Sequence, residues 1–102
     1  MANSARKGAT DSEVMSAAWG SIIVNDTSEK VFDCDLVVSL SDLTVIDRIE
    51  INGATGANVV STYVTTIGNV VPKGGVISGI GADYISAITL GAGAVNLEAK
   101  KP

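Results

Sequence analysis

Histidine is absent from this 102-residue sequence, and cysteine, proline and aromatic residues are scarce. Without histidine the chain lacks the commonest general base, the usual zinc ligand outside all-cysteine sites and the base of most nucleophilic triads. A single cysteine cannot form an intramolecular disulfide, and alone it cannot hold zinc or an iron–sulfur cluster. We therefore expect no enzyme activity, no catalytic residue, no metal and no cofactor. The lone thiol also indicates folding in a reducing compartment.

Long hydrophobic runs and an excess of positive charge are missing as well. No stretch of 18 apolar residues occurs, so we expect no segment that spans a membrane. Seven basic residues stand against eleven acidic ones, which gives a formal net charge of −4. This balance argues against a surface for nucleic acid or for acidic lipids. The sequence therefore predicts neither a nucleic-acid partner nor a membrane partner.

The remaining candidates for a chemical site are weak. Cys34 lies between Asp33 and Asp35, whose charges would raise the pKa of the thiol, so we interpret it as a buried or half-buried small apolar residue. Together with Asp42 and Asp47, these aspartates show neither a fixed spacing nor the pattern of a calcium-binding loop. We interpret them as solvated surface. The glycine pairs lack the strand-before, helix-after context of a phosphate loop and are typical of turns.

β-Branched residues are what the sequence has in abundance. Valine, isoleucine and threonine account for 31 residues, whereas leucine accounts for only five. Such side chains lose rotamer freedom in helices and fit the pleated surface of a sheet. The sequence therefore predicts an all-β fold, a small antiparallel sandwich or barrel of seven or eight short strands. We expect a β domain over residues 19–99, preceded by a flexible N-terminal arm over residues 1–18.

Turn residues divide the β domain into short runs. The runs 21–24 and 30–33 are predicted to form a hairpin, because turn-forming residues occupy 25–28. Residues 59–67 carry the longest alternating pattern and are predicted to be the longest strand. The predicted strands are 21–24, 30–33, 36–40, 44–51, 59–67, 76–80, 84–90 and 94–98.

The arm has its own pattern. Residues 1–10 are small, polar and basic through Arg6 and Lys7, which is typical of a flexible segment. Thr10 and Glu13 have the spacing of a capping box, and one or two helical turns could follow as far as Ala18. The arm is therefore predicted to be flexible, with a short helix possible near its end.

Several predicted strands are apolar or uncharged on both faces. They are 36–40, 59–67 and 84–90, and a monomer of this size has little interior in which to hide them. Self-association or docking on a larger surface would cover these faces. The alternative is a compact monomer with exposed valine and threonine.

Aromatic residues are few enough to be examined one by one. Trp19 stands at the entry to the first strand, and we interpret it as a core residue or an interface anchor. Tyr63 and Tyr84 are not interleaved with basic residues, as a platform for single-stranded nucleic acid would require. The candidate residues for contact with a partner or a second subunit are Arg6, Lys7, Trp19, Tyr63 and Tyr84.

Three segments share a pattern of turns. They read DRIEING at 47–53, VPKGGVI at 71–77 and ISAITL at 85–90. Together they resemble small structural proteins of tailed phages that are encoded near the major capsid gene. In those proteins a strand ending in a glycine turn precedes a V-P-x-G-x-I/L turn and a last strand rich in small residues. The resemblance covers about half of the chain.

This resemblance implies a head decoration or cement protein on the capsid lattice. The implied partners are the major capsid protein and further copies of the chain, with a homotrimer favoured. The implied location is the surface of the phage head, after synthesis in the host cytoplasm. The shared motifs are turns, so no functional residue is carried over from the family. Alternatives are a fibre or spike component, or a carbohydrate- or host-binding module that would use Trp19, Tyr63 or Tyr84.

Overall fold

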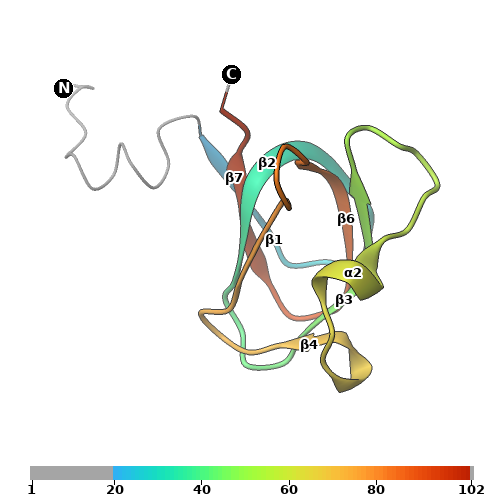
Figure 1. The fold of residues 1–102 in the computed structure, drawn as a ribbon. Helices are drawn as coiled ribbons and strands as arrows, with labels where there is room; N and C mark the ends of the chain where they lie inside the picture. The colour runs from blue at the N-terminus through green and yellow to red at the C-terminus, as the bar shows by residue number, and fades with distance from the viewer. Residues whose placement is uncertain (1–19, 102) are drawn as a thin grey trace, which may run out of the picture.

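Strands dominate the part of the chain that the structure, a computed structural model, describes, which is residues 20–101 (Figure 1). All strand pairings are antiparallel, which confirms the predicted all-β class with seven strands. The predicted arm with its helical turns, Arg6 and Lys7 lies outside the described residues, and so does Trp19, the first residue of the predicted β domain. The elements are β1 (Ser21–Val24), β2 (Lys30–Ser39), β3 (Thr44–Ile51), α2 (Val60–Tyr63), η1 (Ile67–Asn69), β4 (Val70–Val71), β5 (Val76–Ser78), β6 (Ile85–Ala92) and β7 (Val95–Ala99).

The strands form one open sheet around β2. Their order is β1-β7-β2-β6-β3-β4, and β5 also pairs with β2. Cys34 pairs with both β6 and β7, and residues 36–38 pair with both β5 and β7. Therefore β5 and β6 follow one another along the same side of β2, and residues 79–84 connect them. Register shifts on both sides of Cys34 mark bulges, which bend a strand. Figure 1 shows β2 arching over the top of the molecule.

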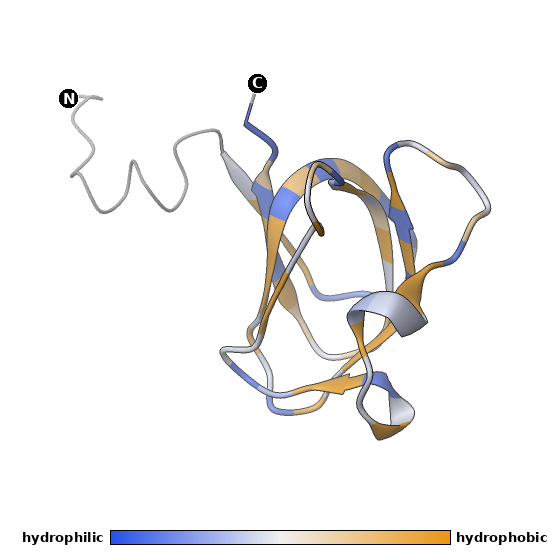
Figure 2. Ribbon diagram, viewed as in Figure 1, coloured by the Kyte–Doolittle hydropathy of each residue, from blue (hydrophilic) through white to orange (hydrophobic). Residues whose placement is uncertain are grey.

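This bend divides the sheet into two regions. The β7 region consists of β1, β7, β5 and the C-terminal half of β2. The β3 region consists of β4, β3, β6 and the N-terminal half of β2. Each region turns one face inward, and the two inner faces supply the core. Figure 2 shows hydrophobic residues concentrated along the strands of both regions. Fully buried core residues include Ile46, Ile49, Ile88 and Leu90 of the β3 region and Val37, Val95 and Leu97 of the β7 region.

The predicted strand at 59–67 is wrong. This segment forms the single turn α2, an extended stretch and the 3-10 turn η1. Val60 and Val64 are four residues apart, and both are buried in the core. The Val64 N–H donates to the Val60 carbonyl at 2.8 Å, which closes the turn.

The reason lies at the edge of β3. The Val59 N–H donates to the carbonyl of Ile49 at 2.8 Å, and the Ile49 N–H donates to Asn58 Oδ1 at 3.2 Å. Asn58 Oδ1 also accepts from the Val60 N–H at 3.0 Å. The start of the segment is thereby used to complete the backbone bonding of β3, so it does not continue as a strand of its own.

The predicted first hairpin is also wrong. β1 pairs with β7, and the predicted runs 30–33 and 36–40 are joined in the single ten-residue strand β2, which ends at Ser39. The turn between β1 and β2 exists, and Asp26 Oδ1 accepts from both the N–H and the hydroxyl of Ser28. However, β2 already has β6 and β7 as neighbours, so β1 adds to the outer side of β7. This placement makes β1 an edge strand.

Candidate functional sites

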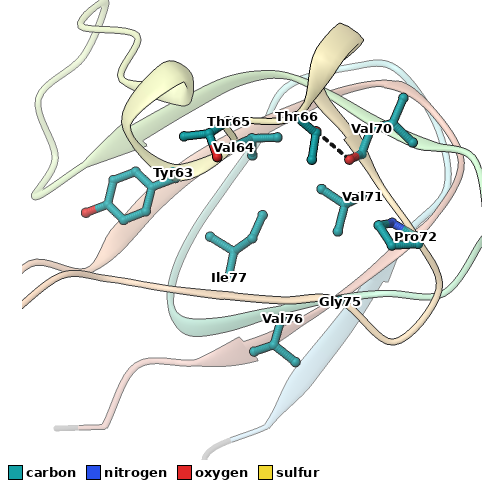
Figure 3. A pocket seen from close by; sticks show the side chains of 10 residues that line it. All are labelled: Tyr63, Val64, Thr65, Thr66, Val70, Val71, Pro72, Gly75, Val76 and Ile77. Atoms are coloured by element: carbon teal, nitrogen blue, oxygen red, sulfur yellow. Dashed lines mark hydrogen bonds between the residues drawn. The ribbon is translucent and has the colours of Figure 1, made fainter.

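Tyr63 lies in a hollow between β5 and the 63–72 segment (Figure 3). The side chain is half-buried against the core, and its hydroxyl accepts a hydrogen bond from the Ile80 N–H at 3.3 Å. Tyr63 thus fastens the connection between β5 and β6 to α2. The residue has a structural role that its position in the sequence did not reveal.

The hollow itself has a volume of about 190 Å³ and no charged side chain. Thr66 Oγ1 donates to the Val70 carbonyl at 2.6 Å, so this hydroxyl is engaged in holding the segment together. Such a lining suits a small apolar group and offers no acid–base pair for catalysis. The lining residues are Tyr63, Val64, Thr65, Thr66, Val70, Val71, Pro72, Gly75, Val76 and Ile77.

Tyr84 takes part in a different set of contacts. Its ring centroid is 5.1 Å from Lys100 Nζ, a cation–π distance. Its N–H donates to Asn52 Oδ1 at 3.1 Å, and its carbonyl accepts from the Asn52 N–H at 3.0 Å. Asn52 has a positive φ of 56°, as the turn after β3 requires. Tyr84 therefore ties this turn to the start of β6 and to the C-terminal residues. Tyr63 and Tyr84 are not part of one common site.

Glu50 is a buried carboxylate that the sequence analysis did not select. Only 6% of its surface is exposed. Its Oε2 accepts from Arg48 Nη2 at 2.9 Å and from the Gly56 N–H at 3.0 Å. These two hydrogen bonds, that of Arg48 first, lower the pKa of the Glu50 carboxyl below its usual value. The available signal was the Arg48/Glu50 pair on one strand face, followed by a loop with Gly53 and Gly56.

An acidic cleft of about 200 Å³ lies beside Glu50. It separates the loop of residues 52–58 (the 52–58 loop) from the beginning of β2. Within residues 20–101, no group of three histidine, cysteine or acidic side chains is arranged to hold a metal ion. The cleft therefore offers negative charge beside a small apolar floor, without a metal-binding geometry. Its lining residues are Glu29, Val31, Asp33, Glu50, Gly53, Thr55, Ser86 and Ala87.

Cys34 is buried at the bend of β2, as predicted. Burial raises the pKa of its thiol to about 12, and the charges of Asp35 and Asp33 add to this effect. The thiol is therefore protonated at neutral pH and is a poor nucleophile. The flanking aspartates act in the expected direction, but burial is the larger cause.

Apolar side chains are exposed on several sides of the domain. Ile67, in η1, is 98% exposed, and Leu43, in the turn between β2 and β3, is also exposed. Among the described residues, strands β2 and β5–β7 also carry exposed or half-buried apolar side chains on their outer faces. Single exposed apolar residues are ordinary, but this distribution marks possible contact surfaces.

Within residues 20–101, β1 has a free backbone edge. The Gly20 carbonyl accepts from the Ala99 N–H at 2.9 Å, so Gly20, Ile22 and Val24 direct their backbone groups at β7. Ser21 and Ile23 consequently direct theirs outward. This edge carries neither proline nor charge, the features that usually prevent strand addition.

Comparisons with protein-family models, with curated proteins and with solved structures found no match for this chain. Within the described residues there is no helix long and apolar enough to cross a membrane.

Proposed function

We propose that this protein is a virion structural protein, a decoration or cement protein that stabilises the head shell of a tailed phage. The observation that carries the proposal is the presence of separate contact surfaces on a small domain: the free edge of β1 and the exposed apolar side chains of Ile67 and Leu43. A subunit on a shell needs contacts to its own copies and to the capsid protein at the same time. The turn patterns at 47–53, 71–77 and 85–90 support a phage origin.

The edge of β1 is the surface that we assign to self-association. A strand from a neighbouring copy would bond to the outward backbone groups of Ser21 and Ile23. In a closed trimer each subunit contacts its two neighbours head to tail, through two different surfaces. The edge of β1 would be one of these two surfaces. Light scattering after size exclusion is the first measurement, and a mass of three subunits is the expected result. A monomer at all concentrations would restrict oligomerisation to the shell surface.

Ile67 is the residue that we assign to the major capsid protein. The test is co-sedimentation with shells assembled from the major capsid protein encoded in the same gene cassette. We expect Ile67→Asp to reduce binding at least about tenfold, because a charge would be buried at the contact. Val31→Asp is the matched control, since Val31 is also exposed but lies on β2. Absence of binding by the unchanged protein would refute the proposal.

The arm over residues 1–18 is assigned to a neighbouring subunit or capsid protein, through Arg6 and Lys7. Residues 1–10, which carry both basic side chains, would order only on assembly and pay their entropy cost at that step. Deletion of residues 1–18 is expected to leave a folded domain that binds shells less tightly. Equal binding by the truncated and full-length proteins would show that the arm has no part in docking.

A fibre, spike or carbohydrate-binding role is the alternative. Sugar sites usually present a free aromatic face, whereas the Tyr63 hydroxyl is bonded and the Tyr84 ring lies beside Lys100. A glycan array distinguishes the two roles: specific binding to a sugar would favour the alternative, and its absence would favour the decoration protein.

A further inference from the structure

The outer face of the β7 region is an apolar surface built from strands in register. Val38 is its centre, because Val38 pairs with Asn96 on one side and with Val76 on the other. Ile23 pairs with Asn96 and extends the row to β1. The residues that share this face are Ile23, Asn96, Val38 and Val76 in one row and Ser21, Glu98, Leu36 and Ser78 in the next.

This face is open within the described residues. Ile23 is 68% exposed and Val76 is 57% exposed, while Leu36 and Val38 between them are half-buried. Glu98 is the one charged residue in the two rows. By contrast, Val37 and Leu97, which alternate with these residues, are fully buried in the core. The face therefore exposes apolar surface, and covering this surface with another segment would be favourable.

The size of the face indicates a small occupant. Four strands about 4.8 Å apart span about 15 Å. A helix of nine residues is about 13 Å long and about 10 Å wide, which matches that span. A stable interface with a second copy buries about 800 Å² on each partner, whereas an apolar patch of this kind offers a few hundred Å². A short segment of the same chain fits the face better than a second domain does.

Residues 11–19 have the composition and the attachment for this role. Val14, Met15, Ala18 and Trp19 have the spacing of one helix face. Their chain enters the described structure at Gly20, immediately before the edge strand β1. Gly20 has a positive φ of 94°, a conformation that glycine adopts readily and that lets the chain change direction just before β1. Its carbonyl is bonded to Ala99, so the attachment point is fixed beside the face.

We propose that residues 11–19 fold back over the outer face of the β7 region of their own chain, with Trp19 over β1, with Val14 and Met15 over β7 and β2, and with the start of the segment towards β5. A tethered segment has a high effective concentration at its site, so a modest apolar contact is enough to hold it. This inference does not depend on the proposed function, because it concerns the free protein. The segment would cover the outer side of the C-terminal half of β2, where Leu36 and Val38 are only half-buried among the described residues.

Trp19 is the single tryptophan of the chain, so its fluorescence reports directly on this contact. The full-length protein is compared with the double variant Ile23→Lys/Val76→Lys and with the control Val31→Lys. All three positions are exposed, so folding should be retained, as circular dichroism and urea unfolding will verify. We expect acrylamide to quench Trp19 several-fold less in the unchanged protein and in the control than in the double variant.

Three results would overturn the proposal. Trp19 in the unchanged protein could be as accessible as N-acetyltryptophanamide, or the double variant could leave its quenching unchanged. Alternatively, the protection could disappear on dilution together with a multimeric mass in light scattering, which would assign the segment to a second copy. As a further readout, deletion of residues 1–18 should increase binding of an apolar dye several-fold, and Leu36→Ser in the truncated protein should reduce it again.

Discussion

Two strands with similar sequence character, β6 and the C-terminal half of β2, have different environments in this protein. Both are apolar or uncharged on both faces. Residues 85–88 of β6 are all buried, whereas Leu36 and Val38 of β2 stay half-exposed on the outer side. From their sequences alone, both strands are expected to need a partner on their outer face. The structure separates them, because one is covered within its own chain.

The two strands differ in burial because their outward side chains differ in size. Ser86 and Ala87 of β6 are small, so the backbone of the 52–58 loop can approach, and the Gly53 N–H donates to Ser86 Oγ at 3.0 Å. Leu36 and Val38 are bulky and hold any backbone at a distance. A strand face of small residues can therefore be covered by the backbone of a loop. A face of branched residues can be covered only by apolar side chains of another segment. The comparison teaches that hydropathy alone does not decide whether a strand face needs a partner.

Truncation of one side chain in each strand should give the largest difference in the free energy of unfolding. Ile88 of β6 is fully buried, so Ile88→Ala should reduce the free energy of unfolding by about 3 kcal/mol through lost burial and a cavity. Val38→Ala, on the open face, should cost about 1 kcal/mol or less. Urea denaturation with an unchanged slope measures both values. Equal losses would mean that the outer face of the β7 region is packed as tightly as the core.

Added volume should separate the two outer faces directly. Ala87→Leu inserts bulk under the 52–58 loop and should destabilise the protein by about 1–3 kcal/mol. Val38→Leu adds volume to a face open among the described residues, and it should change stability by about 0.5 kcal/mol or less. Thermal unfolding of the two variants is the measurement. A neutral Ala87→Leu would contradict close contact between the loop and β6.

The third and smallest effect is on stability at low pH. Acid should weaken the attachment of the 52–58 loop over β6, because Glu50 binds the Gly56 N–H of that loop. The pKa of Glu50 is lowered in the folded protein, so its stabilising effect is present above the usual value of 4.5 and is lost as the pH falls through the folded value. Glu50→Gln should therefore be less stable than the unchanged protein at neutral pH, and the difference should shrink as the pH falls below 4.5 and through the lowered pKa of the folded protein. Urea midpoints over this pH range measure the difference. A constant gap at every pH would show that Glu50 acts through shape and not through charge.

Local turn chemistry accounts for the parts of the fold that could be predicted. The bounds of β1 and β3 agree with the predicted runs 21–24 and 44–51, because polar turn residues mark both ends. The failure at 59–67 has a non-local cause, since the hydrogen bonds that end the strand pattern go to Ile49. The four-residue spacing of Val60 and Val64 was the one local sign of a helical turn.

The candidate sites were less accessible to sequence reasoning. Tyr63 and Tyr84 could be selected because aromatic residues are rare here, but their roles depend on distant partners, the Ile80 N–H and Lys100. Glu50 was passed over, because burial of an acidic strand residue follows from the path of the 52–58 loop. Sequence spacing carries no information about that path.

The central position of β2 also has a consequence for biosynthesis. Lys30 pairs with Ile88, and Cys34 pairs with Ala99, so an early strand needs partners from the last part of the chain. Contacts over such sequence separations slow folding. Until residues 85–99 have left the ribosome, β2 has neither β6 nor β7 beside it. The sheet can therefore be completed only after β6 and β7 have emerged, and loss of β7 would leave β1 and one side of β2 without their partner.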